Sequence, residues 1–129
     1  RMIYAVQPQN ILIQKMELRK VARSHRRKVE IGGAVISGMR FDSSDESQSK
    51  VNSLIDTFDK GWTSLIDFQM PNGAFVPVDK STADGIGQGL AAHVQQSFSA
   101  QKTVIEEIEA GAITTSEQVR AHNAWPSNA

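Results

Sequence analysis

Several features that identify common protein classes are missing from this sequence of 129 residues. It has no cysteine, which excludes a disulfide-stapled scaffold, a zinc site built on thiolates and thiol catalysis. No apolar stretch approaches the roughly 20 residues that a membrane span requires, and the run from Met2 to Val6 is too short for the core of a signal peptide. We therefore expect a soluble chain that forms one domain and is held together by packing.

Net charge is missing as well, because 14 Lys and Arg residues balance 14 Asp and Glu residues. The two signs are nevertheless separated. Residues 1–28 hold eight basic residues and one acidic residue, for +7, and residues 29–129 hold the other six basic and 13 acidic residues, for −7. Crowded like charges repel unless the chain's own acidic half, a neighbouring subunit or a polyanion neutralises them. Six basic residues thus form a candidate interface: Arg19, Lys20, Arg23, Arg26, Arg27 and Lys28.

Aromatic residues are scarce, and the basic run 19–28 contains none. A nucleic-acid module usually keeps a net basic domain and often interleaves stacking aromatic residues with its basic ones. The neutral chain and the purely basic run therefore disfavour nucleic acid as the partner. They favour a helix surface that faces solvent or a neighbouring subunit.

The first third of the chain predicts a helix followed by a hairpin. Asn10 is a suitable N-cap for a helix that we expect to end near His25. The β-prone runs 29–31 and 34–41 then flank Gly32-Gly33. This pattern predicts a hairpin, because glycine accepts the positive φ of tight turns.

The middle of the chain repeats this order. Ser43 and Glu46 have the spacing of a capping box and predict a second helix. Its apolar residues recur at helical spacing: Val51, Leu54, Ile55, Phe58 and Trp62. The runs 66–70 and 74–78 flank Asn72-Gly73, a specific signal for a second hairpin.

A third, long helix is predicted to begin at Asp79 or Ser81 and to end at Gly111. We expect one apolar face on it: Ile86, Leu90, Val94, Phe98, Ile105 and Ile108. Glycines at 85, 87 and 89 weaken its start, so either this region is irregular or something approaches the backbone closely. These glycines lack the preceding strand and the Lys-Ser/Thr of a phosphate-binding loop.

The capping-box spacing of Thr115 and Gln118 predicts a last short helix that ends near His122. Together the elements predict an α+β fold in the order helix, β-hairpin, helix, β-hairpin, long helix, short helix. We expect the two hairpins to share a small antiparallel sheet covered by helices. The chain divides into a basic N-terminal strand/helix arm at 1–28, the α+β domain at 29–122 and an extended C-terminal tail at 123–129.

The polar residues form no recognisable catalytic, cofactor-binding or metal-binding set. Asp42, Asp45 and Glu46 cluster where a helix begins, and carboxylates are favoured there as caps. The histidines are dispersed at positions 25, 93 and 122. His93 adjoins an apolar helix face, so we expect it to be a hydrogen-bonded packing residue.

Four blocks of sequence carry a resemblance to a known family. They are Val29–Gly33, Asp42 with Asp45–Gln48, Asn72–Val76, and Ala91–Phe98 followed by Ile105 and Ile108. With these blocks in this order, the chain resembles a small domain of unknown function that recurs in tailed bacteriophages and prophages, commonly in or beside tail-fibre and tail-tip genes. The motif residues are Gly32, Gly33, Asp42, Asp45, Ser47, Gln48, Asn72, Gly73, Phe75, His93 and Phe98. The resemblance names no catalytic residue.

What the resemblance implies is a location. We expect a non-enzymatic structural or adaptor component of a phage tail fibre, tail tip or baseplate, made in the host cytoplasm and built into the virion. Its partners would be other tail proteins and further copies of itself, in a trimer or hexamer, because tail assemblies are symmetric. No membrane, cofactor or metal is expected. The alternative is a tail-fibre assembly chaperone that is absent from the mature virion.

Overall fold

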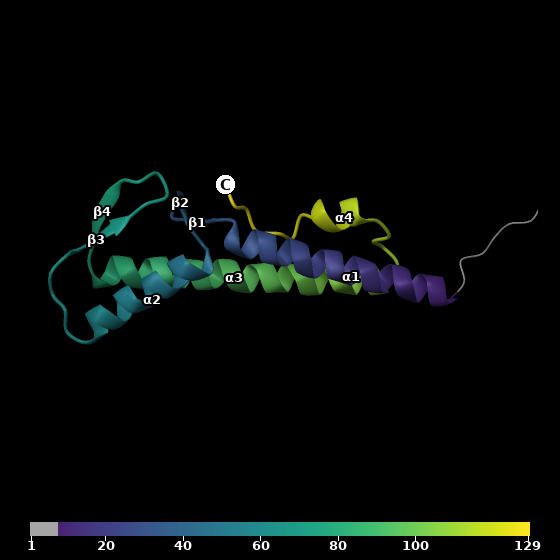
Figure 1. Ribbon diagram of the computed structural model, residues 1–129, viewed down its shortest axis with the longest axis horizontal. Coiled ribbons are helices and arrows are strands. Elements are labelled where there is room, and N and C mark those ends of the chain that lie inside the picture. The colour runs from purple at the N-terminus through teal and green to yellow at the C-terminus, as the bar shows by residue number, and fades with distance from the viewer. Residues whose placement is uncertain (1–7) are drawn as a thin grey trace, which may run out of the picture.

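The computed structural model describes residues 8–129 as an elongated molecule (Figure 1). Its helices are α1 (Pro8–Ile31), α2 (Asp45–Asp59), α3 (Lys80–Glu109) and α4 (Ser116–Arg120), and its strands are β1 (Ala34–Ile36), β2 (Met39–Phe41), β3 (Ile66–Gln69) and β4 (Phe75–Val78). This order confirms the predicted α+β fold. The first seven residues of the predicted basic arm, which include the run from Met2 to Val6, lie outside the described residues.

Helix α3 is the central element of the fold, along which α1 and α2 pack. Its 30 residues span about 45 Å at 1.5 Å per residue. Helix α1 packs antiparallel along the C-terminal half of α3, α2 packs along the N-terminal half, and α4 lies against α1 (Figure 1). Consequently α1 ends and α2 begins beside the middle of α3.

The apolar core is divided into two clusters along α3. One cluster joins α1 to the C-terminal part of α3 and to α4; its buried members are Leu18, Ala22, Val104, Ile108, Ile113 and Val119. The other joins the hairpins and α2 to the N-terminal part of α3; its buried members are Ala34, Phe41, Val51, Val78, Ile86 and Leu90. Between them lie the buried polar residues of the described chain: Glu30, Ser43, His93 and Ser97.

The buried face of α3 differs from the predicted one. Its members recur mainly at alternating spacings of three and four residues: Ala83, Ile86, Leu90, His93, Ser97, Ala100, Val104 and Ile108. This spacing keeps one seam directed at the partner helices. The prediction that Phe98 lies on the face is wrong, since its side chain is 45% exposed. Apolar periodicity identified Ile86, Leu90 and Ile108 correctly but missed the middle of the seam, because polar and small residues occupy it.

The first helix does not end near His25 but continues to Ile31, so the prediction of a strand at 29–31 is wrong. Val29 and Glu30 are both buried on the helix. Tertiary burial therefore overrides the β propensity of the run. Gly33, with φ of 115°, follows the helix, a position that favours glycine.

The turn of the first hairpin is consequently not at Gly32-Gly33. It lies at Ser37 and Gly38, which have φ of 51° and 78° and join β1 to β2 in antiparallel register, with Ala34 paired to Phe41. Positive φ at both central residues is the pattern of a type I′ hairpin turn.

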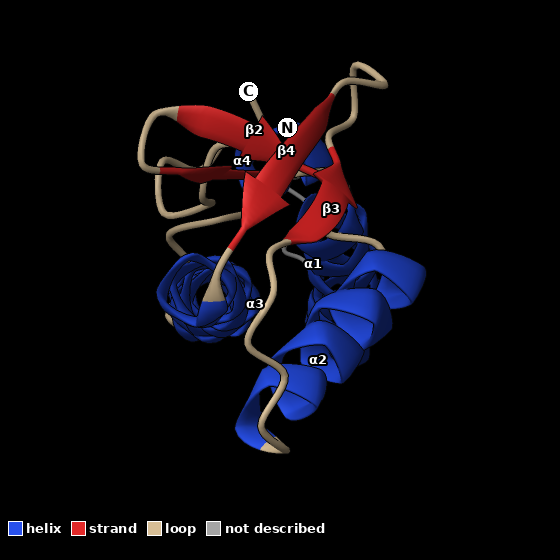
Figure 2. Cartoon of the chain, turned by 90° about the vertical axis from the view of Figure 1, so that its left-hand side faces the viewer, coloured by secondary structure: helices blue, strands red, loops and turns tan. Residues whose placement is uncertain are grey.

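The second hairpin has the predicted Asn-Gly turn, in which Gly73 has φ of 88° and Ile66 pairs with Val78 at the open end. The prediction that the two hairpins share one sheet is wrong, because each forms a separate two-stranded sheet. Figure 2 shows both hairpins on the same side of α2 and α3. Two-stranded sheets are marginal alone, so packing on the second apolar cluster holds them.

The glycines near the start of α3 mark close approaches to a regular helix. A Cβ at Gly87 would meet Ile55 Cδ1 at 2.5 Å, and one at Gly89 would meet three side-chain atoms of Ile36 at 2.6–2.7 Å. Nothing lies within 4 Å of the corresponding point at Gly85. The sequence predicted either an irregular helix start or a close approach to the backbone. The close approach is correct at Gly87 and Gly89.

The prediction that Asn10 caps the first helix is wrong, because α1 begins at Pro8 and Asn10 lies inside it. The caps predicted for the other helices are present with small shifts. Ser44, rather than Ser43, caps α2 by accepting from the backbone N–H of Ser47. Asp79 caps α3 by accepting from the N–H of Thr82. Thr115 forms a capping box at α4, as predicted.

Candidate functional site

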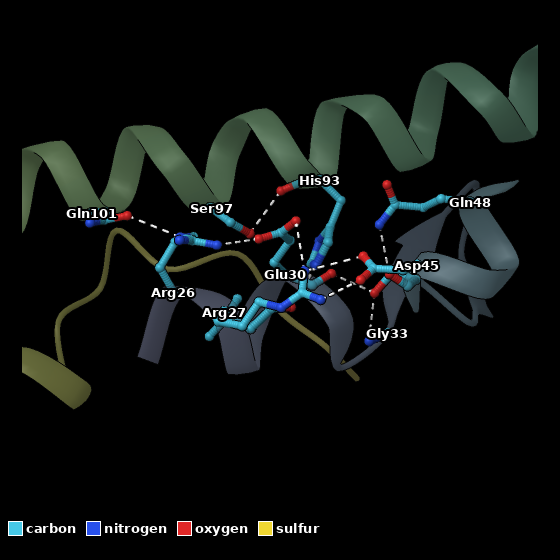
Figure 3. Close-up of polar contacts among 11 residues, drawn as sticks. Arg26, Arg27, Glu30, Gly33, Asp45, Gln48, His93, Ser97 and Gln101 are labelled. Atoms are coloured by element: carbon cyan, nitrogen blue, oxygen red, sulfur yellow. Dashed lines mark hydrogen bonds and ion pairs between the residues drawn. The ribbon is translucent and has the colours of Figure 1, made fainter. Parts of the chain in front are cut away.

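Most of the motif blocks meet where α1 ends, α2 begins and α3 passes both (Figure 3). We call this region the central junction and define it by the four buried polar residues Glu30, Ser43, His93 and Ser97. No buried side-chain nitrogen or oxygen in residues 8–129 lacks a hydrogen-bond partner. The junction is thus a satisfied polar layer between two apolar clusters.

His93 joins α3 to the end of α1. Its side chain is buried, and Nε2 lies 2.8 Å from the carbonyl oxygen of Val29. Because a carbonyl only accepts hydrogen bonds, Nε2 carries the proton in this contact. One turn later, the Ser97 hydroxyl donates to the carbonyl of His93 at 2.9 Å. His93 is therefore the buried, hydrogen-bonded packing residue that its position predicts.

Ser43 joins the end of α1 to the start of α2. Its hydroxyl donates to the carbonyl of Glu30 at 2.7 Å and accepts from the N–H of Gly33 at 2.8 Å. The Gln48 amide donates to the carbonyl of Ser43 at 2.8 Å. One hydroxyl thus bridges the backbone on both sides of the helix end, where carbonyl and N–H groups lack helical partners.

Glu30 brings two arginines into the junction. Its carboxylate accepts from Arg26 at 2.5 Å and from Arg27 at 3.3 Å. Arg26 also donates to the side chain of Gln101 on α3 at 3.0 Å. A buried carboxylate is costly without such partners, so Glu30 depends on both arginines.

Arg27 extends the junction to the first turn of α2, where it forms a bidentate ion pair with Asp45. Hydrogen bonding to Arg27 lowers the pKa of Asp45, and the same contact raises the pKa of Arg27. Both side chains are exposed to solvent, so this pair orients α2 more than it stabilises the fold.

Asp42 forms an Asx turn just before Ser44, the N-cap of α2, and is not a free carboxylate. It accepts from the backbone N–H of Ser44 at 3.0 Å and from the hydroxyl of Ser47 at 2.8 Å. Partial burial raises the pKa of Asp42, but these hydrogen bonds outweigh burial and leave the pKa below its ordinary value.

The C-terminal residues close the junction from outside. The Asn128 side chain donates to the carbonyls of Val29 and Gly33, each at 2.7 Å, and its own carbonyl accepts from Arg40 at 2.9 Å. A Cβ on Gly32 would lie 3.2 Å from the Asn128 side chain. Gly32 therefore leaves room for the tail, and Gly33 leaves room for the Arg40 guanidinium, which a Cβ there would meet at 2.6 Å. The sequence pattern predicted neither contact.

The tail also covers the first apolar cluster. Trp125 packs against this cluster, its indole N–H donates to the carbonyl of Val119 at 2.8 Å, and its ring meets His25 edge-on at 4.9 Å. Burial lowers the pKa of His25, and the nearby charges of Lys28 and Arg120 lower it further.

Four motif residues lie away from the junction. Asn72 and Gly73 form the turn of the second hairpin, and Phe75 follows it with an exposed side chain. Phe98 lies on the outer face of α3, where the Arg26 guanidinium covers its ring at 4.3 Å.

The basic residues of α1 are neutralised in part by the chain's own acidic half. Arg19 forms an ion pair with Glu109 at the end of α3, and Arg26 and Arg27 are paired as described. Among the described residues, Lys20 pairs only with Glu17, on its own helix. Arg23 and Lys28 have no acidic partner within residues 8–129.

Two surface hollows flank the second hairpin. A cleft of about 510 Å³ lies between it and the start of α2, lined by residues that include Asp42, Lys50 and Asp67. An apolar groove of about 220 Å³ separates the hairpins, between Met39 and Val76. In the described part of the chain, no three His, Asp or Glu side chains gather as a metal site requires. None of its helices combines the length and apolarity of a membrane span.

Residues 14–123 match the family model described as "Domain of unknown function (DUF4376)". No curated protein and no solved structure matches the chain.

Proposed function

Because the chain belongs to the DUF4376 family, and because its sequence blocks resemble a domain recurring in phage tail genes, we propose a non-enzymatic role in a bacteriophage tail. In this proposal the chain is a structural or adaptor component of a tail fibre, tail tip or baseplate. It acts by protein–protein assembly, with other tail proteins and further copies of itself as partners.

The proposal is supported chiefly by one observation: most of the motif residues make contacts that hold the chain's own elements together. Gly33, Gln48 and His93 engage the backbone or side chains of other elements at the central junction. Asp42 is hydrogen-bonded in the turn before α2, and Asp45 is paired with Arg27. These residues join helices, and a protein whose distinctive residues hold its own shape is suited to a scaffold role.

The surface offers the contacts that an assembly needs. Arg23 and Lys28 leave positive charge on α1 that residues 8–129 do not pair. Acidic residues dominate the remainder of the chain. Opposite charges meeting across subunits would set register between copies, in a trimer or hexamer of a symmetric tail.

Mass spectrometry of purified virions tests the proposal. The chain should be present in particles freed of cytoplasmic protein, in a constant ratio to known tail subunits. Its presence in infected cytoplasm together with its absence from mature particles would contradict the structural role, and would instead support a tail-fibre assembly chaperone.

A further inference from the structure

The start of α1 projects beyond the rest of the fold. The side chains of Gln14 and Lys15 donate to the carbonyls of Thr114 and Glu109, which places them beside the end of α3 and the loop after it. Residues 9–13 precede these contacts, and their side chains make no hydrogen bond or ion pair to any other described element. Figure 1 shows this end of α1 extending past α3 and α4.

The projecting helix carries a cluster of exposed apolar side chains beside the polar residues Gln9, Asn10 and Gln14. Ile11, Leu12 and Ile13 are consecutive, so they point in three directions around a helix of 3.6 residues per turn. All three are exposed, Leu12 at 66%, and Met16 adds a fourth exposed apolar side chain one turn after Leu12. A free surface of this kind at one end of a molecule marks an interaction site.

Charge decides which occupant fits this surface. Residues 2–14 carry no charged side chain, so a charged partner has nothing to recognise there, whereas an identical segment meets no repulsion. Farther along the same face, four, seven and eleven residues after Met16, stand Lys20, Arg23 and Arg27. Side-by-side parallel copies would bring these basic residues together.

We propose that two copies of this chain pair through the start of α1 in antiparallel orientation, centred near Leu12 and Ile13. Each copy's basic run then lies beyond Pro8, where α1 of the other copy begins. With 1.5 Å per residue, the two Lys20 residues lie about 22 Å apart along the pair. The contact is two-fold and self-complementary, as in most homodimers.

This inference rests on the proposed function in one respect, because that function already includes assembly of the chain with further copies of itself. A two-fold contact also occurs within hexamers built from dimers, so it deepens that proposal by naming one interface. The two can fail separately, because pairing is measured on the pure chain in solution and the tail role on purified particles.

Light scattering after size-exclusion chromatography of the 129-residue chain tests the pairing. We expect a mass near twice the 14.1 kDa of one chain, falling to the single-chain mass in the variant Leu12→Glu/Ile13→Glu. Leu65→Glu is the matched control, since Leu65 is 64% exposed and lies outside the helices; it should keep the doubled mass. Circular dichroism checks that each variant retains its helices.

Cysteine cross-linking tests the orientation, because the chain has no cysteine of its own. Under oxidation, Ile13→Cys should form a disulfide-linked dimer and Lys20→Cys should not. A wild-type chain that stays at 14.1 kDa would overturn the proposal, as would residues 1–7 covering the surface within one copy. A three-chain mass, loss of pairing in Leu65→Glu, or equal cross-linking at both positions would overturn it too.

Discussion

The imidazole Nε2 of His93 lies 2.8 Å from the carbonyl oxygen of Val29, 64 residues earlier in the chain. The N–H of Gly33, which a continuing helix would direct to this carbonyl, is bonded instead to the Ser43 hydroxyl. Val29 lies in the last turn of α1 and its carbonyl receives donors from α3 and from Asn128 in the tail. One backbone oxygen thus joins three segments, between two apolar clusters that do not share a buried member.

Replacing His93 by alanine should lower the free energy of unfolding by about 2 kcal/mol or more. The substitution removes a buried hydrogen bond and leaves space where the ring packs. Gln95→Ala, at an exposed position on the same helix, is the control and should change stability by less than about 0.5 kcal/mol. Urea denaturation followed by circular dichroism measures both. Equal stability of the two variants would show that the junction contributes little.

Alanine at the three glycines of α3 should give three different results. Gly85→Ala should stabilise the fold by about 0.5–1 kcal/mol, because the site is open and alanine favours helix. At Gly87 only the tip of Ile55 must move, so the gain and the strain should nearly cancel. Gly89→Ala should destabilise, since the new Cβ meets the whole branched side chain of Ile36.

Thermal unfolding of the three single variants gives the order directly. Gly89→Ala should destabilise the fold less in the Ile36→Ala background than in the wild-type chain, because the clashing side chain is then absent. If Gly89→Ala proves as stabilising as Gly85→Ala, the close packing of β1 on α3 is contradicted.

His25 should titrate below its ordinary pKa of 6.5, because burial, Lys28 and Arg120 all disfavour the imidazolium. The folded state then binds a proton less readily than the unfolded chain. The contribution of neutral His25 to the free energy of unfolding is therefore fully present above pH 6.5. It is lost as the pH falls from 6.5 through the lowered pKa of His25 in the folded state. An NMR titration of the imidazole signals measures this midpoint, and His25→Gln assigns it. A midpoint at or above 6.5 would contradict the packing of His25 under Trp125.

The basic surface of α1 should be found in contact with acidic surfaces of other chains. Lysine-to-carboxylate cross-linking of the assembled protein should link Lys20 and Lys28 to acidic residues of neighbours at low salt, and these links should disappear near 1 M salt, where the screening length is about 3 Å. Lys60, which pairs with Asp56 on its own helix end, serves as the reference. Links that persist unchanged at high salt would count against charge-guided register.

Local signals in the sequence predicted most of the fold correctly. Three features depend only on neighbours within four residues, so a short stretch of sequence is enough to predict each of them. They are the Asn72-Gly73 turn, the Asp79 cap and the Thr115 capping box. The end of α1 was mispredicted because burial of Val29 against α3 outweighs a local β preference.

The central junction was less predictable than the fold. Position next to an apolar face identified His93 as a packing residue. Nothing local marks Ser43, Ser97 or Glu30 as buried, because polar residues enter a core only where distant partners satisfy them. The role of Asn128 depends on contacts nearly a hundred residues away in sequence, which a single sequence does not reveal.

A reconstruction of purified phage tails at side-chain resolution tests the proposed tail role. We expect density for the antiparallel α1–α3 pair, with α2 continuing along α3 and the second hairpin beside it, in regular copies within a fibre, tip or baseplate. A tail in which all density is assigned to other proteins, from a phage shown to express this chain, would contradict the structural role.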